Sequence, residues 1–335
     1  MLPEILSLLR GAFKVPAETP NLQPRLLQWK YYDPGPAWAG SRSYVIRKGD
    51  TIVAHACVWP IRLATPSGSI DAIQALDWAG AQGVPGAGVI LMRKLEGLAQ
   101  VLITCGGSED THQVLPQIGF VRQQGSIGVY ARVLRPWRQF RTRPAEGRKA
   151  IPRLLRNAWW SRSPVADADG WTSQPTPPSA EVLSALDTMP AGAPESRYRA
   201  EFLEFMQRCP GARIRCFALL KKGQAQGFFM LARVVGQTRL ADLRIVSREP
   251  EDWASAYSVA VRTALQDPEA CELLAYAPVP LVAEALEANG FRSRGSLPVF
   301  VRDPKELLAG AGALHLSMLD DDSAFLNFPE YPYAT

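Results

Sequence analysis

Two stretches of the sequence, Leu115-Pro116-Gln117-Ile118-Gly119-Phe120 and Leu286-Glu287-Ala288-Asn289-Gly290-Phe291, share the pattern Leu-x-x-x-Gly-Phe. Each is followed by a basic residue, a Gly-Ser pair and a run typical of a β-strand. We interpret each stretch as the end of a short helix that leads into strand structure. The two stretches lie 171 residues apart, which suggests that the chain contains one unit twice.

A second pair of similar stretches supports this repeat. Apolar residues flank Lys48-Gly49 within residues 44–54, and apolar residues flank Lys222-Gly223 within residues 217–230. Each pattern predicts a β-hairpin. The two turns lie 174 residues apart, nearly the offset of the first pair. A steady offset across two different motifs indicates an internal repeat.

We expect one order of elements in both copies: hairpin, strand, helix, strand, short helix and closing strands. The central helix of the first copy is predicted because Pro85 suits a first turn, and Leu91, Leu95 and Leu98 recur at helical spacing. The first copy is predicted to have strands at 43–48, 51–63, 69–79 and 101–105, helices at 86–98 and 108–117, and paired strands at 120–134. The second is predicted to have strands at 213–221, 224–235, 238–246 and 271–276, a helix carrying Trp253, Tyr257, Val261 and Leu265, a helix at 280–289, and strands beyond Phe291.

This arrangement resembles the GNAT superfamily of N-acetyltransferases over about residues 25–135 and 195–303. More narrowly, it resembles double-domain members found among bacterial exopolysaccharide genes and related in architecture to Fem-type aminoacyltransferases. The resemblance implies an α/β (α+β) fold of two tandem GNAT-like domains, each a mixed, mainly antiparallel twisted sheet flanked by helices. The chain length of 335 residues fits two domains of roughly 150 residues. We expect a first domain at 1–135, a connector at 136–195, and a second, degenerate domain with a C-terminal extension at 196–335.

The resemblance implies that acetyl-CoA or another acyl-CoA binds as co-substrate, its pyrophosphate on a glycine-rich loop that opens the central helix. Here that loop is Gln82-Gly83-Val84-Pro85-Gly86-Ala87-Gly88. A helix N-terminus offers free N–H groups and partial positive charge, and glycines let phosphates approach closely. Gly86 and Gly88 fit the family pattern, whereas Gln82 stands one place early. A surface turn before an ordinary helix is the alternative reading of such a short pattern.

The equivalent stretch of the second copy, Ser247-Arg248-Glu249-Pro250-Glu251-Asp252-Trp253, has no glycine and three carboxylates. Carboxylates at this position would repel an incoming phosphate. We therefore expect coenzyme A to bind only the first copy.

Acyl transfer to an amine needs a base, an oxyanion donor and an acid near the departing thiolate. Many family members use a tyrosine as the acid, but Leu115 and Leu286 occupy the corresponding positions. The candidates for catalysis are Asp77 as base, His112 as acid and Ser108 beside it. Each has an ordinary alternative: Asp77 as a turn or capping group, His112 as a solvated helix residue, and Ser108 as a helix N-cap.

Three further features have both a functional and a structural explanation. Cys105 could take an acyl group, or it could be a small buried hydrophobe. The aromatic residues of the stretch 29–32, with Trp59, Trp78 and Trp253, would suit stacking on a sugar, although core packing is the commoner role. The carboxylates of residues 320–322 could cap an acceptor groove, but a solvated acidic turn is the commoner explanation.

The segment between the copies is strongly basic. Residues 132–162 contain ten Lys or Arg and one acid, Glu146, a net charge of +9 against +5 for the whole chain. Because the excess charge belongs to this connector, a nucleic-acid-binding surface over the whole protein is not expected, and nucleic acid is not favoured as a partner; RNA binding by the connector is the weakest of its three readings. The pair Trp159-Trp160 among cations suits an anionic membrane surface, while a helix packed on a domain is the alternative. Residues 161–195, rich in Ser, Pro, Ala and Asp, predict a loose connection.

Several classes of protein are not expected. The five cysteines show no CxxC pairing, and the three histidines lack a second ligand at metal-site spacing, so neither a disulfide framework nor a metal enzyme is indicated. No window reaches the ~18 apolar residues of a membrane span, which favours a cytoplasmic location, with peripheral membrane contact through the connector.

The leading hypothesis is an acyl-CoA-dependent N- or O-acyltransferase acting on a small-molecule, sugar or polysaccharide-precursor acceptor. The alternatives are a catalytically silent GNAT-like scaffold or ligand-binding module, and a Fem-like aminoacyltransferase.

Overall fold

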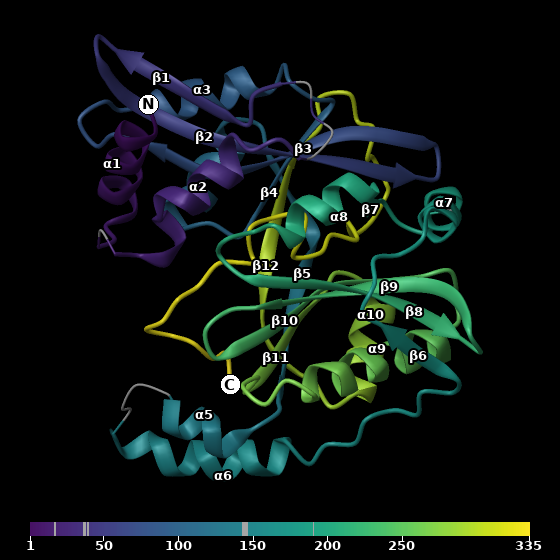
Figure 1. The fold of residues 1–335 in the computed structure, drawn as a ribbon. Helices are drawn as coiled ribbons and strands as arrows, with labels where there is room; N and C mark the ends of the chain where they lie inside the picture. The colour runs from purple at the N-terminus through teal and green to yellow at the C-terminus, as the bar shows by residue number, and fades with distance from the viewer. Residues whose placement is uncertain (17, 36–37, 39, 143–146, 190) are drawn as a thin grey trace.

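The structure is a computed structural model that describes residues 1–335 apart from residues 17, 36–37, 39, 143–146 and 190. In this described part, twelve strands join in one mostly antiparallel sheet with helices on its faces (Figure 1). The predicted mixed α/β class is therefore confirmed.

The first half begins with helices that the motifs do not predict: α1 (Leu2–Phe13), the short η1 (Pro20–Leu22) and α2 (Pro24–Tyr31). The elements that follow match the prediction within a few residues. They are β1 (Ser43–Lys48), β2 (Thr51–Thr65), β3 (Gly68–Gly80), α3 (Ala87–Leu95), β4 (Val101–Cys105) and α4 (Glu109–Gln117). The first three strands are antiparallel neighbours, and β4 pairs parallel to β3.

The second half repeats this order and this pairing. Its elements are β8 (Arg213–Lys221), β9 (Gln224–Arg233), β10 (Gln237–Ile245), α9 (Pro250–Leu265), β11 (Glu272–Ala277) and α10 (Pro280–Ala288). The first three strands are again antiparallel, and β11 pairs parallel to β10. The predicted hairpin, helix and following strand are thus confirmed in both halves, and the structure adds that this strand pairs parallel.

The halves are joined by an exchange of strands. After α4 the chain forms β5 (Val121–Val133), which pairs with β11 of the second half, and after α10 it forms β12 (Arg292–Arg302), which pairs with β4 of the first. The strands β5 and β12 also pair with each other and run between the two halves (Figure 1). The division at residues 135 and 195 stays a prediction, because one sheet spans both halves.

The prediction of paired closing strands at 120–134 and beyond Phe291 is wrong, because each segment is one long strand. The Gly-Ser pairs at 125–126 and 295–296 lie inside these strands. At Gly295, with φ of 141°, the ladder between β12 and β5 shifts register. A glycine within a strand often marks such a bulge.

The Leu-x-x-x-Gly-Phe stretches end α4 and α10 in the same way. Gly119 and Gly290 adopt positive φ values of 89° and 73°. The amide of Phe120 donates to the carbonyl of Leu115, and that of Phe291 to the carbonyl of Leu286, each over 3.1 Å. This pattern satisfies carbonyls at the helix end and explains the glycine. The two Leu-x-x-x-Gly-Phe stretches therefore share one backbone geometry.

The connector is structured where it is described, so the prediction of a loose connection over 161–195 is wrong. It contains α5 (Pro136–Thr142), η2 (Gly147–Lys149), α6 (Ala150–Trp160), β6 (Trp171–Gln174), α7 (Ala180–Thr188) and β7 (Glu195–Arg197), followed by α8 (Ala200–Gln207). Strand β6 extends the sheet beside β8, and β7 pairs with β2. Glu146 of the basic segment lies outside the described residues. Within the described chain, no helix has the length and apolarity needed to cross a bilayer.

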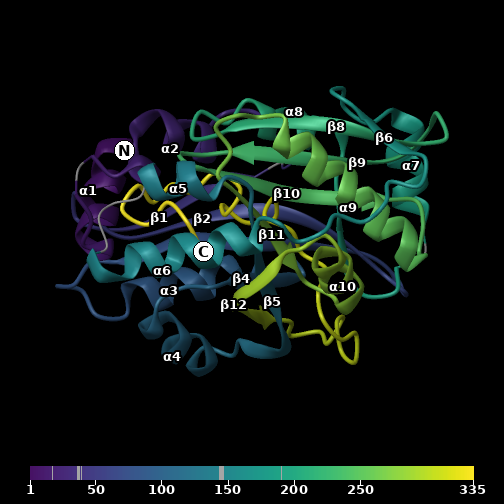
Figure 2. The same cartoon turned by 90° about the horizontal axis from the view of Figure 1, so that it is seen from below.

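Three hydrophobic cores cover the sheet. One lies under α3 and α4, and one under α9 and α10. The largest lies between the halves and includes side chains of α1, α2, α8, β2 and β9. Figure 2 shows α1 and α2 separated from α3 and α4 by the first strands. Trp29, Trp59 and Trp253 are buried in these cores, as core packing predicts.

Candidate functional site

The predicted loop 82–88 lies at the start of α3, as expected. Gly86 is the N-cap of α3 and has φ of 81°, a conformation that favours glycine. Within the described chain, the amides of Gly86, Gly88 and Val89 have no hydrogen-bond partner. Most of the loop is exposed. It therefore presents free amides at the positive end of a helix dipole, which is a favourable place for an anion.

Trp78 holds this loop against β3. Its indole Nε1 donates to the carbonyl of Gly88 over 2.9 Å. A Cβ atom at Gly88 would lie 3.1 Å from the same nitrogen, and one at Gly80 would lie 3.3 Å from the amide of Gly88. Small residues are therefore needed where the loop crosses the strand. Trp78 appears among the aromatic candidates, but its contact with the loop has no signal in the sequence.

Beyond the loop, β3 and β4 part. They pair only from Ala72 with Val101 to Gln74 with Ile103. The ladder between β2 and β3 also shifts register between His55 and Cys57, and Asp77, with φ of 47°, lies opposite this shift. A bulge of this kind leaves backbone groups unpaired. Between the loop and the centre of the sheet, β3 therefore has a stretch of backbone that does not pair with β4.

Asp77 belongs to a buried ion cluster. The Nζ of Lys30 lies 2.7 Å from carboxylate oxygens of both Asp77 and Asp322. The hydroxyl of Tyr31 donates to Asp77 over 2.6 Å, and the Nδ1 of His55 lies 3.1 Å from its carbonyl oxygen. Burial opposes ionisation of Asp77, but the Lys30 ammonium prevails and lowers the pKa of this carboxyl. The role of Asp77 as a base stays a prediction. Its contacts with Lys30 and Tyr31 also give it a part in the buried ion cluster.

His112 and Ser108 lie on α4, on the opposite face of the sheet from the Asp77 side chain. The His112 Nε2 lies 2.9 Å from the carbonyl oxygen of Gly106, and its ring centre lies 5.4 Å from that of Phe300. Ser108 is the N-cap of α4 and accepts from the amide of Thr111. The structure thus brings Ser108 and His112 together but does not bring Asp77 into contact with either.

A second group of polar side chains lies where β3 and β4 part. Gln74 is fully buried; its Oε1 lies 3.9 Å from the Sγ of Cys105, and its Nε2 has no partner in the described chain. Burial, together with the charge of Asp321, raises the pKa of the Cys105 thiol. Burial, with the charge of Asp322, raises the pKa of Asp321 to about 8. Sequence reasoning missed Gln74, because a lone glutamine in an apolar strand carries no motif.

The explanation of residues 320–322 as a solvated acidic turn is wrong. Asp320 and Asp321 are buried, with relative exposures of 3% and 5%, and Asp322 joins Lys30 in the cluster above. This segment reaches the central core because the chain after β12 turns back between the halves. We name residues 320–322 the acidic segment.

The start of α9 differs from the start of α3. Asp252 accepts hydrogen bonds from Lys221, Trp171 and Ser247. Burial opposes ionisation, but these bonds lower the pKa of Asp252. The amides of Asp252 and Trp253 both donate to the carbonyl of Glu249. The Asp252 side chain therefore puts a carboxylate, held by three donors, at this helix N-terminus, although no side chain caps the helix amides.

Leu115 and Leu286, at the positions where the family often has a tyrosine, are fully buried. Neither can supply a proton. Among the described residues, no cluster of three or more His, Cys, Asp or Glu side chains is arranged to hold a metal ion.

No family model and no curated protein matches this sequence. Several solved structures, however, match the structure of the chain. A GCN5-related N-acetyltransferase from Anabaena variabilis matches with a TM-score of 0.60 and 9% identity, over 90% of this chain and 70% of that chain. A conserved protein of unknown function from Enterococcus faecalis, described as a candidate N-acyltransferase, matches with a TM-score of 0.57 and 9% identity, over 90% and 69%.

A candidate acetyltransferase from Pyrococcus horikoshii matches with a TM-score of 0.54 and 12% identity, over 94% of this chain and 91% of that chain. At such low identity the likeness concerns the fold alone. The chain therefore has a fold similar to that of GCN5-related N-acetyltransferases.

Proposed function

We propose that this chain is an acyl-CoA-dependent N- or O-acyltransferase whose first half binds the co-substrate. The observation that carries the proposal is the set of free amides on loop 82–88, at the N-terminus of α3 and beside the parted strands. Pyrophosphate oxygens would accept from these amides, and the pantetheine arm would extend between β3 and β4. The two halves would be tandem GNAT-like units, the second degenerate because Asp252 occupies the start of α9.

The chemistry expected at this place is transfer of an acyl group from sulfur to nitrogen or oxygen. The acceptor attacks the thioester carbonyl, a new C–N or C–O bond forms, and the C–S bond breaks. The proton lost by the acceptor leaves with coenzyme A as its thiol. The buried Nε2 of Gln74 has no partner and lies where the strands part, so it is a candidate donor to the oxyanion.

Calorimetric titration with acetyl-CoA tests the proposal. We expect one site per chain, with hydrogen-exchange protection of residues 82–88 and none of residues 247–253. Absence of binding would refute it. Binding without acyl transfer to any acceptor would favour the alternative, a silent GNAT-like scaffold, which the buried leucines at 115 and 286 also favour.

Asp77 and His112 remain the predicted acid–base pair. Replacing Asp77 by Asn, or His112 by Ala, should lower turnover by about 100-fold or more if the residue transfers a proton. Turnover is measured as thiol released from acetyl-CoA in the presence of glucosamine 6-phosphate. Asp110→Asn, on the first turn of α4, is the matched control. Near-normal rates in both variants, with unchanged circular dichroism, would remove the pair from the mechanism.

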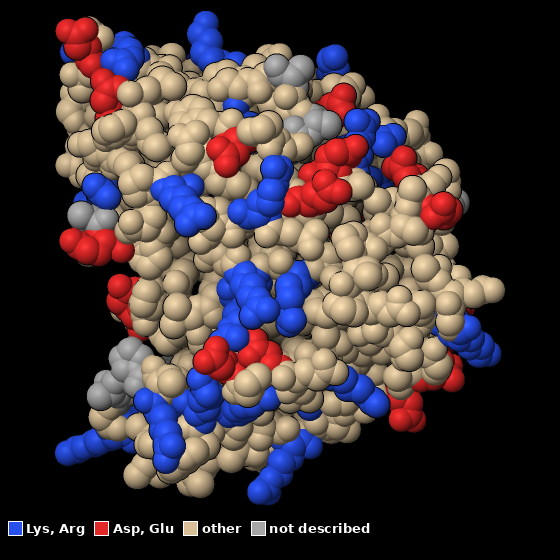
Figure 3. Space-filling view, viewed as in Figure 1, with Lys and Arg blue, Asp and Glu red and all other residues tan. Residues whose placement is uncertain are grey.

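The surface of α5 and α6 supports peripheral contact with anionic lipid. It exposes several large apolar side chains: Trp137, Phe140, Ile151, Leu155 and Trp159. On α6 they recur every four residues and so share one face. Figure 3 shows Lys and Arg gathered over this lower part of the molecule. Apolar side chains among cations are typical of helices that lie on anionic membranes.

We expect the protein to sediment with vesicles containing phosphatidylglycerol and not with phosphatidylcholine alone. Trp159→Ala should weaken this binding, whereas Tyr331→Ala, which removes an exposed aromatic ring elsewhere, should not. Salt should also weaken it, because exposed charges are screened beyond ~8 Å at physiological ionic strength. Sedimentation that ignores lipid charge would contradict the proposal.

A further inference from the structure

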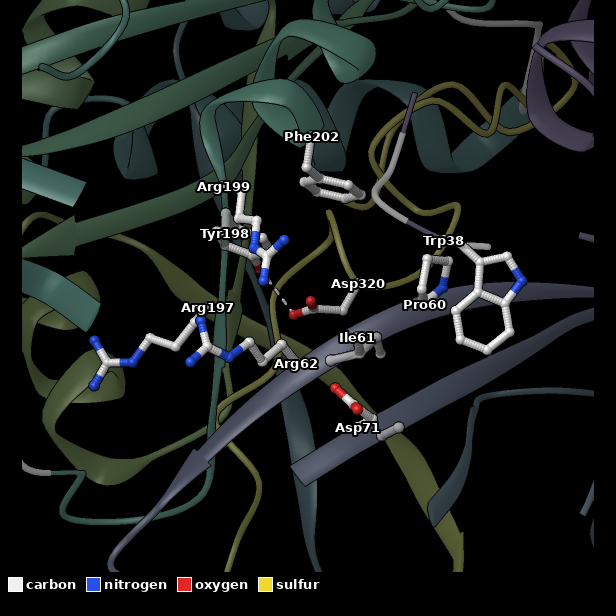
Figure 4. Close-up of a pocket in the computed structure, with 11 residues that line it drawn as sticks. Trp38, Pro60, Ile61, Arg62, Asp71, Arg197, Tyr198, Arg199, Phe202 and Asp320 are labelled. Atoms are coloured by element: carbon white, nitrogen blue, oxygen red, sulfur yellow. Dashed lines mark hydrogen bonds between the residues drawn. The ribbon is translucent and has the colours of Figure 1, made fainter. Parts of the chain in front are cut away.

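A pocket of about 310 Å³ opens between the two halves (Figure 4), and no residue of loop 82–88 lines it. Its walls come from the end of β2, the start of β3, the segment from β7 to α8, and the acidic segment. Ala72, which lines it, lies two residues before Gln74, the last residue at which β3 pairs with β4. The pocket is therefore next to the place where an acyl group would lie.

One side of the pocket is aromatic. Tyr198 and Phe202 stack with ring centres 5.3 Å apart, and Trp38 lies opposite them, beside Pro60 (Figure 4). Ligand pockets commonly have volumes of roughly 300–1,000 Å³. A pocket at the lower end of that range suits a small molecule and not a polymer chain.

Asp320 offers the pocket an oxygen that nothing in the described chain uses. Three donors converge on its Oδ2: the hydroxyls of Ser196 and Tyr198, at 2.7 and 3.0 Å, and the amide of Ser317, at 2.7 Å. No described residue donates to its Oδ1. The carboxyl group is thus fixed in position by one oxygen, with the other left to accept a hydrogen bond from a ligand.

Four further charged side chains line the pocket. Two of them are paired, Arg62 with Asp187 and Arg197 with Glu195. By contrast, neither Arg199 nor the carboxylate of Asp71 has a side-chain partner in the described part of the chain. The pocket therefore combines a free cation with two carboxyl groups that can accept hydrogen bonds.

We infer that this pocket binds the acceptor of acyl transfer, and that the acceptor is a small primary amine that also carries an anionic group. The inference rests on the proposed function. An ammonium group would be held by Asp320 Oδ1 and Asp71, and a carboxylate or phosphate by Arg199. The aromatic walls would contact the carbon skeleton. A charge-assisted hydrogen bond at each end would select against neutral sugars and simple amines.

Calorimetry on the full chain without acyl-CoA tests this inference. The probes are glucosamine 6-phosphate and L-glutamate, which carry both groups in a sugar and in an amino acid. Glucosamine lacks the anion, and N-acetylglucosamine 6-phosphate lacks the free amine. We expect glucosamine 6-phosphate or L-glutamate to bind. If glucosamine 6-phosphate binds, glucosamine and N-acetylglucosamine 6-phosphate should each bind at least about tenfold more weakly. Binding of neither double-charged probe would overturn the inference.

Variants at exposed positions link that binding to the pocket. Arg199→Ala and Asp71→Asn should each weaken it by about tenfold, and Arg292→Ala, an exposed arginine on β12, should leave it unchanged. Equal affinity in all three variants would place the ligand elsewhere.

Acetyl-CoA is titrated in parallel. If it binds while the acceptor probes do not, only this inference falls; if the probes bind while acetyl-CoA does not, the proposed function falls.

Discussion

Replacing Gly86 by glutamate should abolish the binding of coenzyme A thioesters, lowering their affinity by about 100-fold or more. The physical reason is twofold. Gly86 caps α3 with φ of 81°, which a side chain adopts only under strain. The added carboxylate would also meet the helix dipole and repel the pyrophosphate, as we expect of the acidic residues at the start of α9.

Two further variants separate strain from charge. Asn tolerates positive φ, so Gly86→Asn keeps the loop neutral and should bind nearly normally. Gly83 has open space around its Cβ position and no positive φ, so Gly83→Glu adds the charge without the strain and should weaken binding. Retained affinity in both glutamate variants would show that loop 82–88 does not hold the phosphates.

Replacing Lys30 by methionine should lower the free energy of unfolding by ~3–5 kcal/mol. Lys30 is 2% exposed, and its ammonium lies 2.7 Å from both Asp77 and Asp322. Without it two neighbouring carboxylates would remain buried with no counter-charge. The change conserves length and apolar contact, so the loss would reflect charge and not a cavity.

The Lys30 variant should also respond to pH with a definite sign. The folded-state pKa of Asp77 is lowered in the natural chain, so its stabilising contribution is present above the unfolded value and is lost as pH falls through the folded value. Without Lys30 the pKa of Asp77 should rise, and its protonation should relieve the repulsion as pH falls. We therefore expect the difference in stability to shrink from pH 7 toward pH 4.

Urea denaturation at several pH values measures this difference. Lys94→Met, on the exposed side of α3, is the matched control and should change stability by at most ~0.5 kcal/mol. A loss below about 1 kcal/mol for the Lys30 variant at pH 7 would show that the cluster contributes little to the folded state.

The sequence is a good guide to the order of the elements. Apolar runs predict β1, β4 and β8 at their observed bounds, and the spacing of leucines predicts α3. The glycine pattern locates a loop with free amides, and the acids at 249, 251 and 252 distinguish α9 from α3. These features are local, because periodicity, capping and turn formation depend on residues within a few positions of one another.

The candidate site depends on contacts that no local pattern records. Lys30 and Asp322 are 292 positions apart, and Ser196 and Asp320 are 124 positions apart. A lysine near the start and a run of acids near the end each predict solvated groups when considered singly. Their burial follows from the return of the chain after β12 into the central core.

The exchange of β5 and β12 is a second feature that local sequence does not predict. Both strands follow the same motif, and both have a pattern that could close either half, so local propensity cannot choose between self-pairing and exchange. The choice depends on the long-range ladders of β12 with β4 and of β5 with β11. Local sequence was therefore sufficient for the order of the elements and the loop, whereas long-range strand pairing and burial established the single sheet, the ion cluster and the pocket between the halves.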